Sequence, residues 1–252
     1  MTDSTLDQAL EVLQNAMDRV VRTQYDGITS AARLAADALA AGGVLQAFGT
    51  GHSRAFAMEL TGRAGGLIPT NQLSVKDLVM FGDADPAEVL DPMCERDPGL
   101  APRILAHHRV RPEDLFLIAS NSGINGTVVE MARVARANGN KIVAVTSLSH
   151  SAAMASRHPS GERLHDLADV VIDNCGVPGD AAYPLPGGGA IVATSTMTTV
   201  LVAQLITAET CAELMARGID PPVYRSNNIE GGDAHNAALL ASYRDRVRAM
   251  EP

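Results

Sequence analysis

Apolar residues recur along this chain with a helical period at its start, and the pattern predicts two leading helices. The first pattern covers 4–22, and five apolar residues carry it: Leu6, Leu10, Leu13, Met17 and Val20. A second amphipathic pattern covers 26–41 and ends in an Ala-Gly-Gly segment, which is typical of a helix C-terminus. We therefore expect residues 1–42 to form a helical segment that packs on the core or on a subunit interface.

Short apolar runs rich in β-branched residues follow, and they predict strands. Four runs are clear, at 44–48, 115–120, 141–147 and 169–173, and a shorter run at 66–70 adds a fifth. Helical patterns separate them, at 53–64, about 98–109, 126–138 and, more weakly, 150–157. Strands that alternate with helices and are apolar on both faces favour a parallel sheet covered on both sides, a three-layer α/β fold. Sheets of this kind bind ligands beyond the carboxyl ends of their strands.

The last third of the chain predicts a loop, a long helix and a tail. Segment 173–189 is rich in Gly and Pro and is expected to be a loop, and a helix follows over about 192–217. Residues 190–208 carry no charge and are nearly long enough to span a bilayer, but their many Thr, Ser and Gln residues favour a buried core helix. The tail, 218–252, is predicted to begin extended, to end in a short helix and to contact a neighbouring subunit.

Composition limits the class of ligand. The net charge of −9 argues against a nucleic-acid partner, and a chain with no Trp, four Tyr and four Phe has few rings to stack on bases or sugars. The three cysteines form no CxxC pair and their number is odd, which is typical of free thiols in a reducing cytoplasm. No basic and apolar leader opens the sequence, so we expect a cytoplasmic protein with no membrane association.

The turn after the first strand, "FGTGHS", raises the possibility of a dinucleotide site. Gly49 and Gly51 match the G-x-G-x-x-G fingerprint, but its third glycine is replaced by Arg54. The acidic residue that would bind a ribose is also missing, because the chain has Pro69, Thr70 and Asn71 at that distance. The turn is therefore expected to face a different anion.

A second motif, "IASNSGINGT", predicts a phosphate site where the strand ending near residue 120 enters a helix. Hydroxyl, amide and glycine residues allow backbone N–H groups to approach an anion, and the helix N-terminus adds a partial positive charge. The motif residues are Ser120, Asn121, Ser122, Gly123, Asn125, Gly126 and Thr127. The alternative is plain helix capping, but four Ser or Asn residues and two Gly within eight positions exceed what one cap needs.

These strand ends resemble the SIS (sugar isomerase) family of phosphosugar-binding domains. "FGTGHS", "SNSGINGT", "AVTSL" and "DVVIDN" look like its successive signatures. "ASRHPSGERL" and "PPV…GGDAHN" are similar to a bacterial sugar-isomerase-domain family related to sedoheptulose-7-phosphate isomerase and N-acetylmuramic acid 6-phosphate etherase. The resemblance implies five parallel strands over 43–217 and homodimers or tetramers with shared sites. It also implies that Ser120, Asn121, Ser122 and Asn125 surround the phosphate, with Ser53 near the sugar.

The resemblance also implies chemistry at C2 of an open-chain sugar phosphate. A carboxylate can remove the C2 proton, and the resulting enolate gives either aldose–ketose isomerisation or β-elimination at C3. Glu59, in "AMELTGRAGG", is the candidate base, although both relatives place their glutamate about one turn further on, where this chain has Arg63. The alternative for Glu59 is a simple ion pair with Arg63 at i, i+4.

The second acid/base of the heptose isomerase, a histidine on its last long helix, has no counterpart here. Val200 lies near that position, which favours elimination over isomerisation. Replacements could be Glu95, in "CERDPG", or His235 of a neighbouring chain, in "GGDAHN". The alternatives are a solvated loop carboxylate for Glu95 and a helix-start residue for His235.

Other polar residues are expected to shape the sugar pocket. They are Gly49, Gly51 and His52 in the first turn, and Thr146, Ser147, Asp180 and Ser195 elsewhere. N-capping or core packing is the alternative for Ser195. The remaining histidines lack the spacing of metal ligands, so neither a metal nor a cofactor is expected.

Three functions remain open at this point. The first is a lyase acting on a hexose 6-phosphate, such as an N-acetylated amino sugar phosphate, by eliminating a C3 substituent. The second is an aldose–ketose phosphosugar isomerase. The third is a phosphosugar sensor without catalysis, which would have to act through protein partners, since a chain with this charge is a poor DNA binder.

Overall fold

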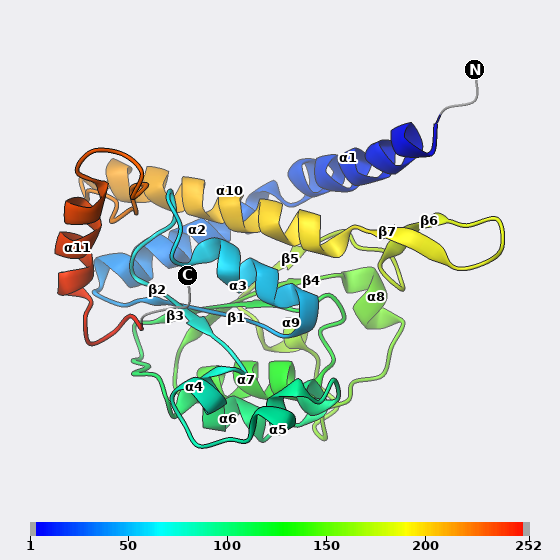
Figure 1. Cartoon of the computed structure of the whole chain (residues 1–252), viewed down its shortest axis with the longest axis horizontal. Helices are drawn as coiled ribbons and strands as arrows, with labels where there is room; N and C mark the ends of the chain where they lie inside the picture. The colour runs from blue at the N-terminus through cyan, green and yellow to red at the C-terminus, as the bar shows by residue number, and fades with distance from the viewer. Residues whose placement is uncertain (1–3, 249–252) are drawn as a thin grey trace.

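A five-stranded parallel sheet forms the centre of the molecule (Figure 1). The computed structural model describes residues 4–248. The strands are β1 (Leu45–Gly49), β2 (Thr70–Leu73), β3 (Leu115–Ala119), β4 (Lys141–Thr146) and β5 (Val170–Asp173). Their order is β2-β1-β3-β4-β5, and all neighbours are parallel. The predicted three-layer α/β class is confirmed.

The strand order creates a switch point between β1 and β3. The chain leaves β1 to form β2 on one side and then returns past β1 to form β3 on the other. Because the connections after β1 and β3 diverge, the space beyond their carboxyl ends is the place where sheets of this type bind ligands. Gly49 and Ala119 are paired in register, so the segments that follow them start side by side.

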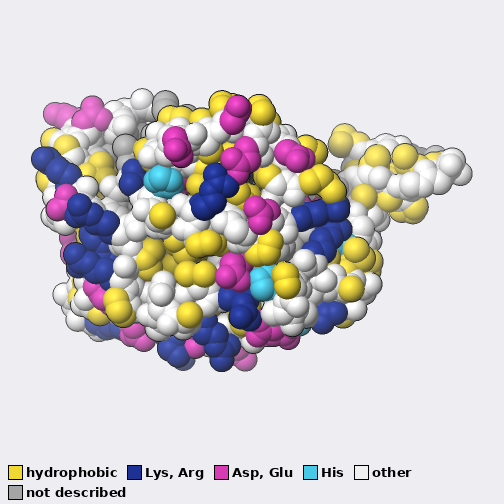
Figure 2. Space-filling model, turned by 90° about the horizontal axis from the view of Figure 1, so that it is seen from below, with side chains coloured by type: hydrophobic (Ala, Val, Ile, Leu, Met, Phe, Trp, Pro, Cys, Tyr) yellow, Lys and Arg dark blue, Asp and Glu magenta, His cyan; other side chains and the backbone are white. Residues whose placement is uncertain are grey.

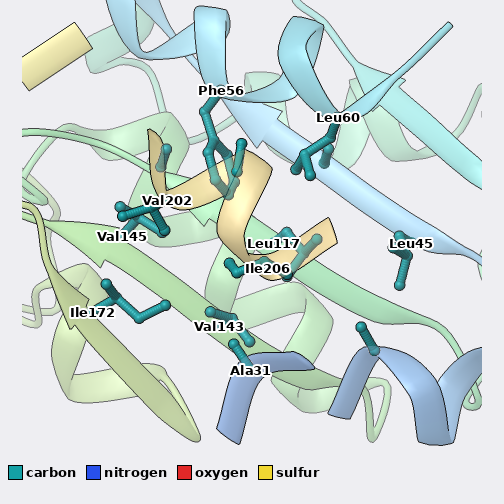
Figure 3. Close-up of a cluster of buried hydrophobic side chains, with 14 of the residues drawn as sticks. Ala31, Leu45, Phe56, Leu60, Leu117, Val143, Val145, Ile172, Val202 and Ile206 are labelled. Carbon is teal, nitrogen blue, oxygen red and sulfur yellow. The ribbon is translucent and has the colours of Figure 1, made fainter. Parts of the chain in front are cut away.

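Helices cover both faces of the sheet and build two separate cores. On one face lie α2 (Tyr25–Ala40), α3 (Arg54–Leu60) and α10 (Ser195–Ala216), together with the C-terminal part of α1 (Thr5–Thr23). Figure 3 shows this core, where Phe56, Val202 and Ile206 meet the strand residues Leu117, Val143 and Val145. Burial of each large apolar side chain contributes about 1.5–3 kcal/mol, so this face holds the helices firmly against the strands.

The second core lies under the opposite face. It is built by α4 (Asp77–Met80), α6 (Leu100–Leu105), α7 (Gly126–Ala137) and α9 (Leu164–Leu167). Phe116 and Ile118 of β3 point into this core, whereas Leu117 points into the first. This alternation explains the uninterrupted apolar runs in the sequence, since strands covered on both sides need apolar residues at every position.

Helix α10 has the length and the apolar composition of a membrane span, which no other helix among the described residues has. In this structure it packs against α2 and α3. Thr198, Thr207 and Thr210 are buried in it and donate hydrogen bonds to carbonyls one turn back in the same helix. The contacts are those of a core helix, as its composition predicted.

Several elements differ in length from the predictions. Helix α3 ends at Leu60 because Thr61 is extended and Gly62 has a left-handed backbone. Strand β2 begins at Thr70, later than the predicted run, since Gly66 and Ile68 bond instead to Tyr224 and Pro222 of the tail. The helix expected at 98–109 is the shorter α6, and the weak pattern at 150–157 is α8 (Leu148–Ala152).

The prediction of a loop throughout 173–189 is wrong at 181–184. A hairpin forms there from β6 (Ala181–Pro184) and β7 (Ala190–Ala193), with Tyr183 paired to Ile191. Pro186 and the three glycines that follow it form the turn between the strands, whereas Gly176, Pro178 and Gly179 precede β6. Four further short helical elements were also missed: α4, α9, α5 (Pro86–Leu90) and the 3-10 turn η2 (Cys94–Arg96).

The tail folds back onto the amino-terminal edge of the sheet of its own chain. Val223 forms an isolated bridge with Leu67, and α11 (Gly232–Ser242) follows. Asn71 of β2 then donates to the Arg246 carbonyl at 2.7 Å and accepts from the Arg248 N–H at 2.9 Å. The tail is thus anchored within one chain, and its predicted contact with a neighbouring subunit stays a prediction.

Candidate functional site

The turn after β1 is tight and joins the ends of β1 and β3. A side chain at Gly49 would collide with the backbone of Ser53, so only glycine allows the chain to fold back at this point. Gly51 has a φ of +55°, which glycine adopts without strain. As a result the Ser53 hydroxyl reaches the backbone N–H of Asn121, which follows β3, at 3.4 Å.

Glu95 places a carboxylate between these two strand ends. One of its oxygens accepts a hydrogen bond from the Thr50 hydroxyl at 2.8 Å, and the other accepts from the Asn125 amide at 2.7 Å. Glu95 lies in η2, whose position depends on Gly126, because a side chain there would collide with the Arg96 carbonyl. The carboxylate is therefore held at the switch point by two neutral donors.

The start of α7 keeps its first-turn N–H groups free of side-chain caps. Asn125 occupies the N-cap position with an extended backbone, but its side chain makes no capping hydrogen bond. Its Nδ2 donates to Glu95, and its Oδ1 accepts from the Arg157 guanidinium at 2.6 Å. Capping therefore does not explain Asn125. Uncapped N–H groups at the N-terminus of a 12-residue helix suit an anion.

Arg157 is a cation that the sequence interpretation missed. It is exposed, and its backbone N–H donates to the Ile124 carbonyl at 2.9 Å, which keeps it beside the start of α7. The segment "ASRHPSGERL" was noted only as part of a resemblance. An arginine in a Ser- and Gly-rich segment after a strand end is the signal that could have indicated it.

Ser120, Asn121 and Gly123 build the turn that precedes α7. The Gly123 N–H donates to the Ser120 hydroxyl at 3.1 Å, and the Asn121 side chain accepts from the Asn174 amide at 3.1 Å. Gly123 has a φ of +64°, and a side chain there would approach the Thr146 hydroxyl to 2.9 Å. Ser122 is half-buried, and its hydroxyl bonds to nothing in the part of the chain that the structure describes. Ser122 is thus the free hydroxyl of the motif.

The other expected pocket residues support the fold around this cluster. The Thr127 hydroxyl donates to the Asp97 carbonyl at 2.7 Å, and the Ser147 hydroxyl donates to the Gly176 carbonyl at 2.6 Å. Asp180 caps α10 by accepting from both the N–H and the hydroxyl of Ser195, each at 2.8 Å. Ser195 is the first residue of α10, and both its N–H and its hydroxyl are held by Asp180, while Thr127 is fully buried.

Glu59 is engaged elsewhere in the single chain. Its carboxylate accepts hydrogen bonds from Arg63, one turn on in the sequence, and from Gln204 of α10. The bond to Gln204 joins α3 to α10. Within the described residues the Glu59 carboxylate makes no hydrogen bond to Ser53. The ion-pair alternative is thus present in the structure, and a role for Glu59 as a base requires it to exchange these partners.

The two candidate histidines lie at opposite ends of the sheet. His52 is exposed in the turn after β1, next to Ser53. His235 lies on α11, where its Nε2 is 3.0 Å from the Val223 carbonyl at the amino-terminal edge of the sheet. Figure 1 shows α11 and the hairpin at opposite ends of the molecule. His235 can therefore join the Glu95 cluster only if a neighbouring chain supplies it.

Cys94 borders Glu95 but is no candidate nucleophile. Burial and the negative charges of Glu95 and Asp91 raise the pKa of the Cys94 thiol. All three cysteines of the chain are free, as the odd number and spacing predicted. A raised pKa keeps the Cys94 thiol protonated, and this form is a weak nucleophile.

The comparison with known families gives the class to which this fold and site belong. The model of the SIS domain matches residues 10–147, so the chain belongs to the SIS domain family. Its relatives include UPF0309 protein lmo0025 of Listeria monocytogenes, which is 38% identical over 231 residues, 91% of this chain and 93% of that protein. UPF0309 protein SCO4393 of Streptomyces coelicolor is 40% identical over 243 residues, 96% of this chain and 94% of that protein. The resemblance drawn from the strand-end motifs is confirmed.

Solved structures share the fold at low sequence identity. Phosphoheptose isomerase GmhA from Neisseria gonorrhoeae superimposes with a TM-score of 0.56 at 18% identity, covering 82% of this chain and 97% of that one. Vibrio vulnificus NanR complexed with ManNAc-6P gives 0.50 at 13% identity, with coverages of 86% and 66%. At these identities the likeness establishes the fold alone.

Proposed function

We propose that this protein binds a sugar 6-phosphate beyond the carboxyl ends of β1 and β3, with the phosphate at the start of α7. The uncapped first turn of α7, the free Ser122 hydroxyl and the nearby Arg157 supply donors and positive charge. NanR of Vibrio vulnificus, which shares this fold, was solved with the sugar phosphate ManNAc-6P, and this supports the ligand class.

We assign Glu95 as the base that removes the C2 proton of the open-chain sugar. The position of Glu95 carries this assignment, because its carboxylate accepts one hydrogen bond from Thr50, which follows β1, and one from Asn125, which precedes α7. The C2 proton is acidic because the C1 aldehyde stabilises the resulting enolate. The proposed base and the proposed phosphate site are therefore neighbours. One substrate that carries both the C2 proton and the phosphate requires this arrangement.

The reaction we favour is β-elimination at C3. Glu95 takes the C2 proton, the C–H electrons form the C2–C3 double bond through the enolate, and the C3–O bond breaks. The departing oxygen takes a proton and leaves as water or an alcohol. Helix α10 carries no histidine at the place where the heptose isomerase has its second acid/base, and this absence favours elimination over isomerisation. These are proton transfers, so the proposal involves neither a metal nor a redox cofactor.

Isomerisation is the second candidate. The fold neighbour from Neisseria gonorrhoeae is a phosphoheptose isomerase, and the two reactions share the first proton transfer. They diverge afterwards, because isomerisation returns the proton to C1. In either reaction Glu59, or His235 of a neighbouring chain, would supply the second proton-transfer group. A sensor without catalysis, the third possibility, would bind the sugar phosphate and leave its C2 proton in place.

We infer that the protein is a homo-oligomer that works in the cytoplasm. Helix α1 extends beyond the α/β body (Figure 1), and only Ala16 and Val20 in it are buried, while Leu13 and Met17 are half-buried. Leu6 and Leu10, in its first half, are 76% and 49% exposed. An uncovered apolar stripe of this kind suits a second copy of the chain. The free thiols support a reducing compartment.

Proton NMR in D2O tests the reaction. The protein is incubated with a panel of aldose and 2-acetamido sugar 6-phosphates, and the C2 proton signal is followed. Elimination removes this signal and produces a vinyl resonance, whereas isomerisation produces a ketose. Glu95→Gln should abolish either change, and Glu88→Gln, at an exposed ion pair with Arg103 in the same segment, is the matched control. Binding of a sugar phosphate without any loss of its C2 proton signal would favour the third possibility, a sensor without catalysis.

A further inference from the structure

A cavity of about 290 Å³ opens at the amino-terminal edge of the sheet, the edge opposite Glu95. Six basic residues contribute to its wall: His107, His108, Arg109, Arg244, Arg246 and Arg248. They come from the segment after α6 and from the tail, which Asn71 of β2 anchors at this edge. None of the hydrogen bonds described around Glu95 involves these residues, so the cavity is separate from the proposed sugar site.

The wall of this cavity is positively charged although the chain as a whole is acidic. Asp245 is the one acid in the lining, and it lies 4.0 Å from Arg109. Asp245 offsets one of the four arginine charges and Asp114, which is paired with Arg246, offsets a second, so the wall keeps a net positive charge. Arg244 is exposed and has no ion pair within the described residues. Figure 2 shows Lys and Arg side chains gathered at the left end of the molecule, the end that carries α11 in Figure 1.

Two lining side chains keep a buried nitrogen without a partner. A terminal N–H of Arg246 donates a hydrogen bond to Asp114 at 2.5 Å. The Arg246 Nε is buried and has no hydrogen bond among the described residues. The His108 ring is 1% exposed and bonds through Nε2 to Asp77 at 2.8 Å, while its Nδ1 is also unpartnered. Buried polar atoms in proteins nearly always have a partner, because leaving one unmatched is costly. Two of the side chains that line the cavity therefore keep an unused hydrogen-bonding atom.

We propose that this cavity is a second anion site, which binds the phosphoryl group of a small molecule. The guanidinium group of arginine presents several N–H donors in a plane, which matches the oxygens of a phosphate. The lining of this cavity contains four arginines and no lysine. Asp114 fixes the Arg246 guanidinium, and the Phe81 ring lies 4.2 Å from the Arg248 guanidinium, so two of the four are already oriented. The volume of about 290 Å³ suits a small phosphorylated compound.

Histidine NMR distinguishes this site from the proposed sugar site. Inorganic phosphate is titrated at constant pH and ionic strength while the ring C–H signals are followed, with His107 and His108 reporting on the cavity and His52 on the turn after β1. The variant is Arg109→Gln/Arg244→Gln, which removes two exposed charges and leaves the Arg246–Asp114 pair in place. The control, Arg22→Gln/Arg33→Gln, removes equal charge from α1 and α2.

We expect the His107 and His108 signals to shift with saturation in the wild-type protein and in the control. In the cavity variant the dissociation constant reported by these signals should rise at least tenfold, with the His52 response unchanged. A shift of His52 alone, or a cavity response that is equal in both variants, would overturn the proposal. A second titration with glucose 6-phosphate identifies the source of the phosphoryl group: tighter binding than phosphate indicates a phosphorylated metabolite, and equal binding indicates inorganic phosphate.

Discussion

The side-chain amide of Asn125 donates a hydrogen bond to the carboxylate of Glu95 at 2.7 Å, across 30 residues of sequence. This bond joins the first turn of α7, where we place the phosphate, to the carboxylate that we place over C2. Because the Asn125 side chain bonds to Glu95 and Arg157, it caps none of the first-turn N–H groups of the helix. One residue therefore links substrate binding to the base.

Asn125→Asp should separate folding from binding. The loss of the donor to Glu95 is offset in part by the helix N-terminus and by Arg157, so the free energy of unfolding should fall by about 1–2 kcal/mol. The same charge faces Glu95 and the phosphate, so sugar phosphate affinity should fall at least about tenfold. Calorimetric titration measures this loss. Asn125→Ser, which keeps a donor, should retain binding, and equal affinity in Asn125→Asp and wild type would contradict a phosphate at this turn.

Gly126→Ala should destabilise the protein by about 1–3 kcal/mol, because the new methyl group collides with the Arg96 carbonyl and displaces η2. Since η2 carries Glu95, activity should fall together with stability. Urea unfolding measures the first effect. Gly187→Ala is the control, as no atom lies within 4 Å of a side chain built there. Equal stability of the two variants would show that η2 does not depend on this close approach.

Arg246→Met should loosen the tail from the sheet. Arg246 and Asp114 are buried together, and removal of the arginine leaves the carboxylate with only the N–H donors of Val44, Gln46 and Arg111. Breaking one side of a buried ion pair costs about 3 kcal/mol. Hydrogen exchange of α11 should accelerate in this variant. An unchanged free energy of unfolding would mean that the pair contributes no stability.

Stability should decline with rising pH above the ordinary thiol pKa of about 9. Burial raises the pKa of the Cys211 thiol, so the unfolded chain loses this proton first and binds fewer protons than the folded chain. The stabilisation is complete below pH 9 and is lost as the pH passes through the folded pKa. Urea titrations between pH 9 and 10.5 should show a smaller decline in Cys211→Ala, and an identical decline would refute the assignment.

Leu6→Glu/Leu10→Glu should dissociate the proposed oligomer. Both leucines are exposed in the single chain, so the charges cost little within one copy, but they would be buried against a second copy. Light scattering measures the molar mass. A monomeric wild-type protein, or a variant with wild-type mass, would exclude this stripe as the subunit interface.

The sequence predicted the sheet and its long helices because their apolar periods are strong. It predicted the strand ends at Gly49 and Ser120 for the same reason. It missed the hairpin at 181–193 and η2, since elements of three or four residues have no readable period. The Glu95 contact with Thr50 spans 45 residues and depends on how an irregular segment packs. Glu95 was a candidate from its residue type alone, and Arg157 was not one at all.

The most direct test of the account is a crystal structure of Glu95→Gln, which should bind the sugar without turning it over, soaked with a reactive sugar 6-phosphate. We predict the phosphate on the N–H groups of the first turn of α7, beside Ser122 and Arg157. We also predict that C2 lies about 3–3.5 Å from the side chain at position 95, within reach for proton transfer. A phosphate in this place with C2 turned toward Glu59 would reassign the base. A sugar phosphate bound away from the carboxyl ends of β1 and β3 would contradict the account.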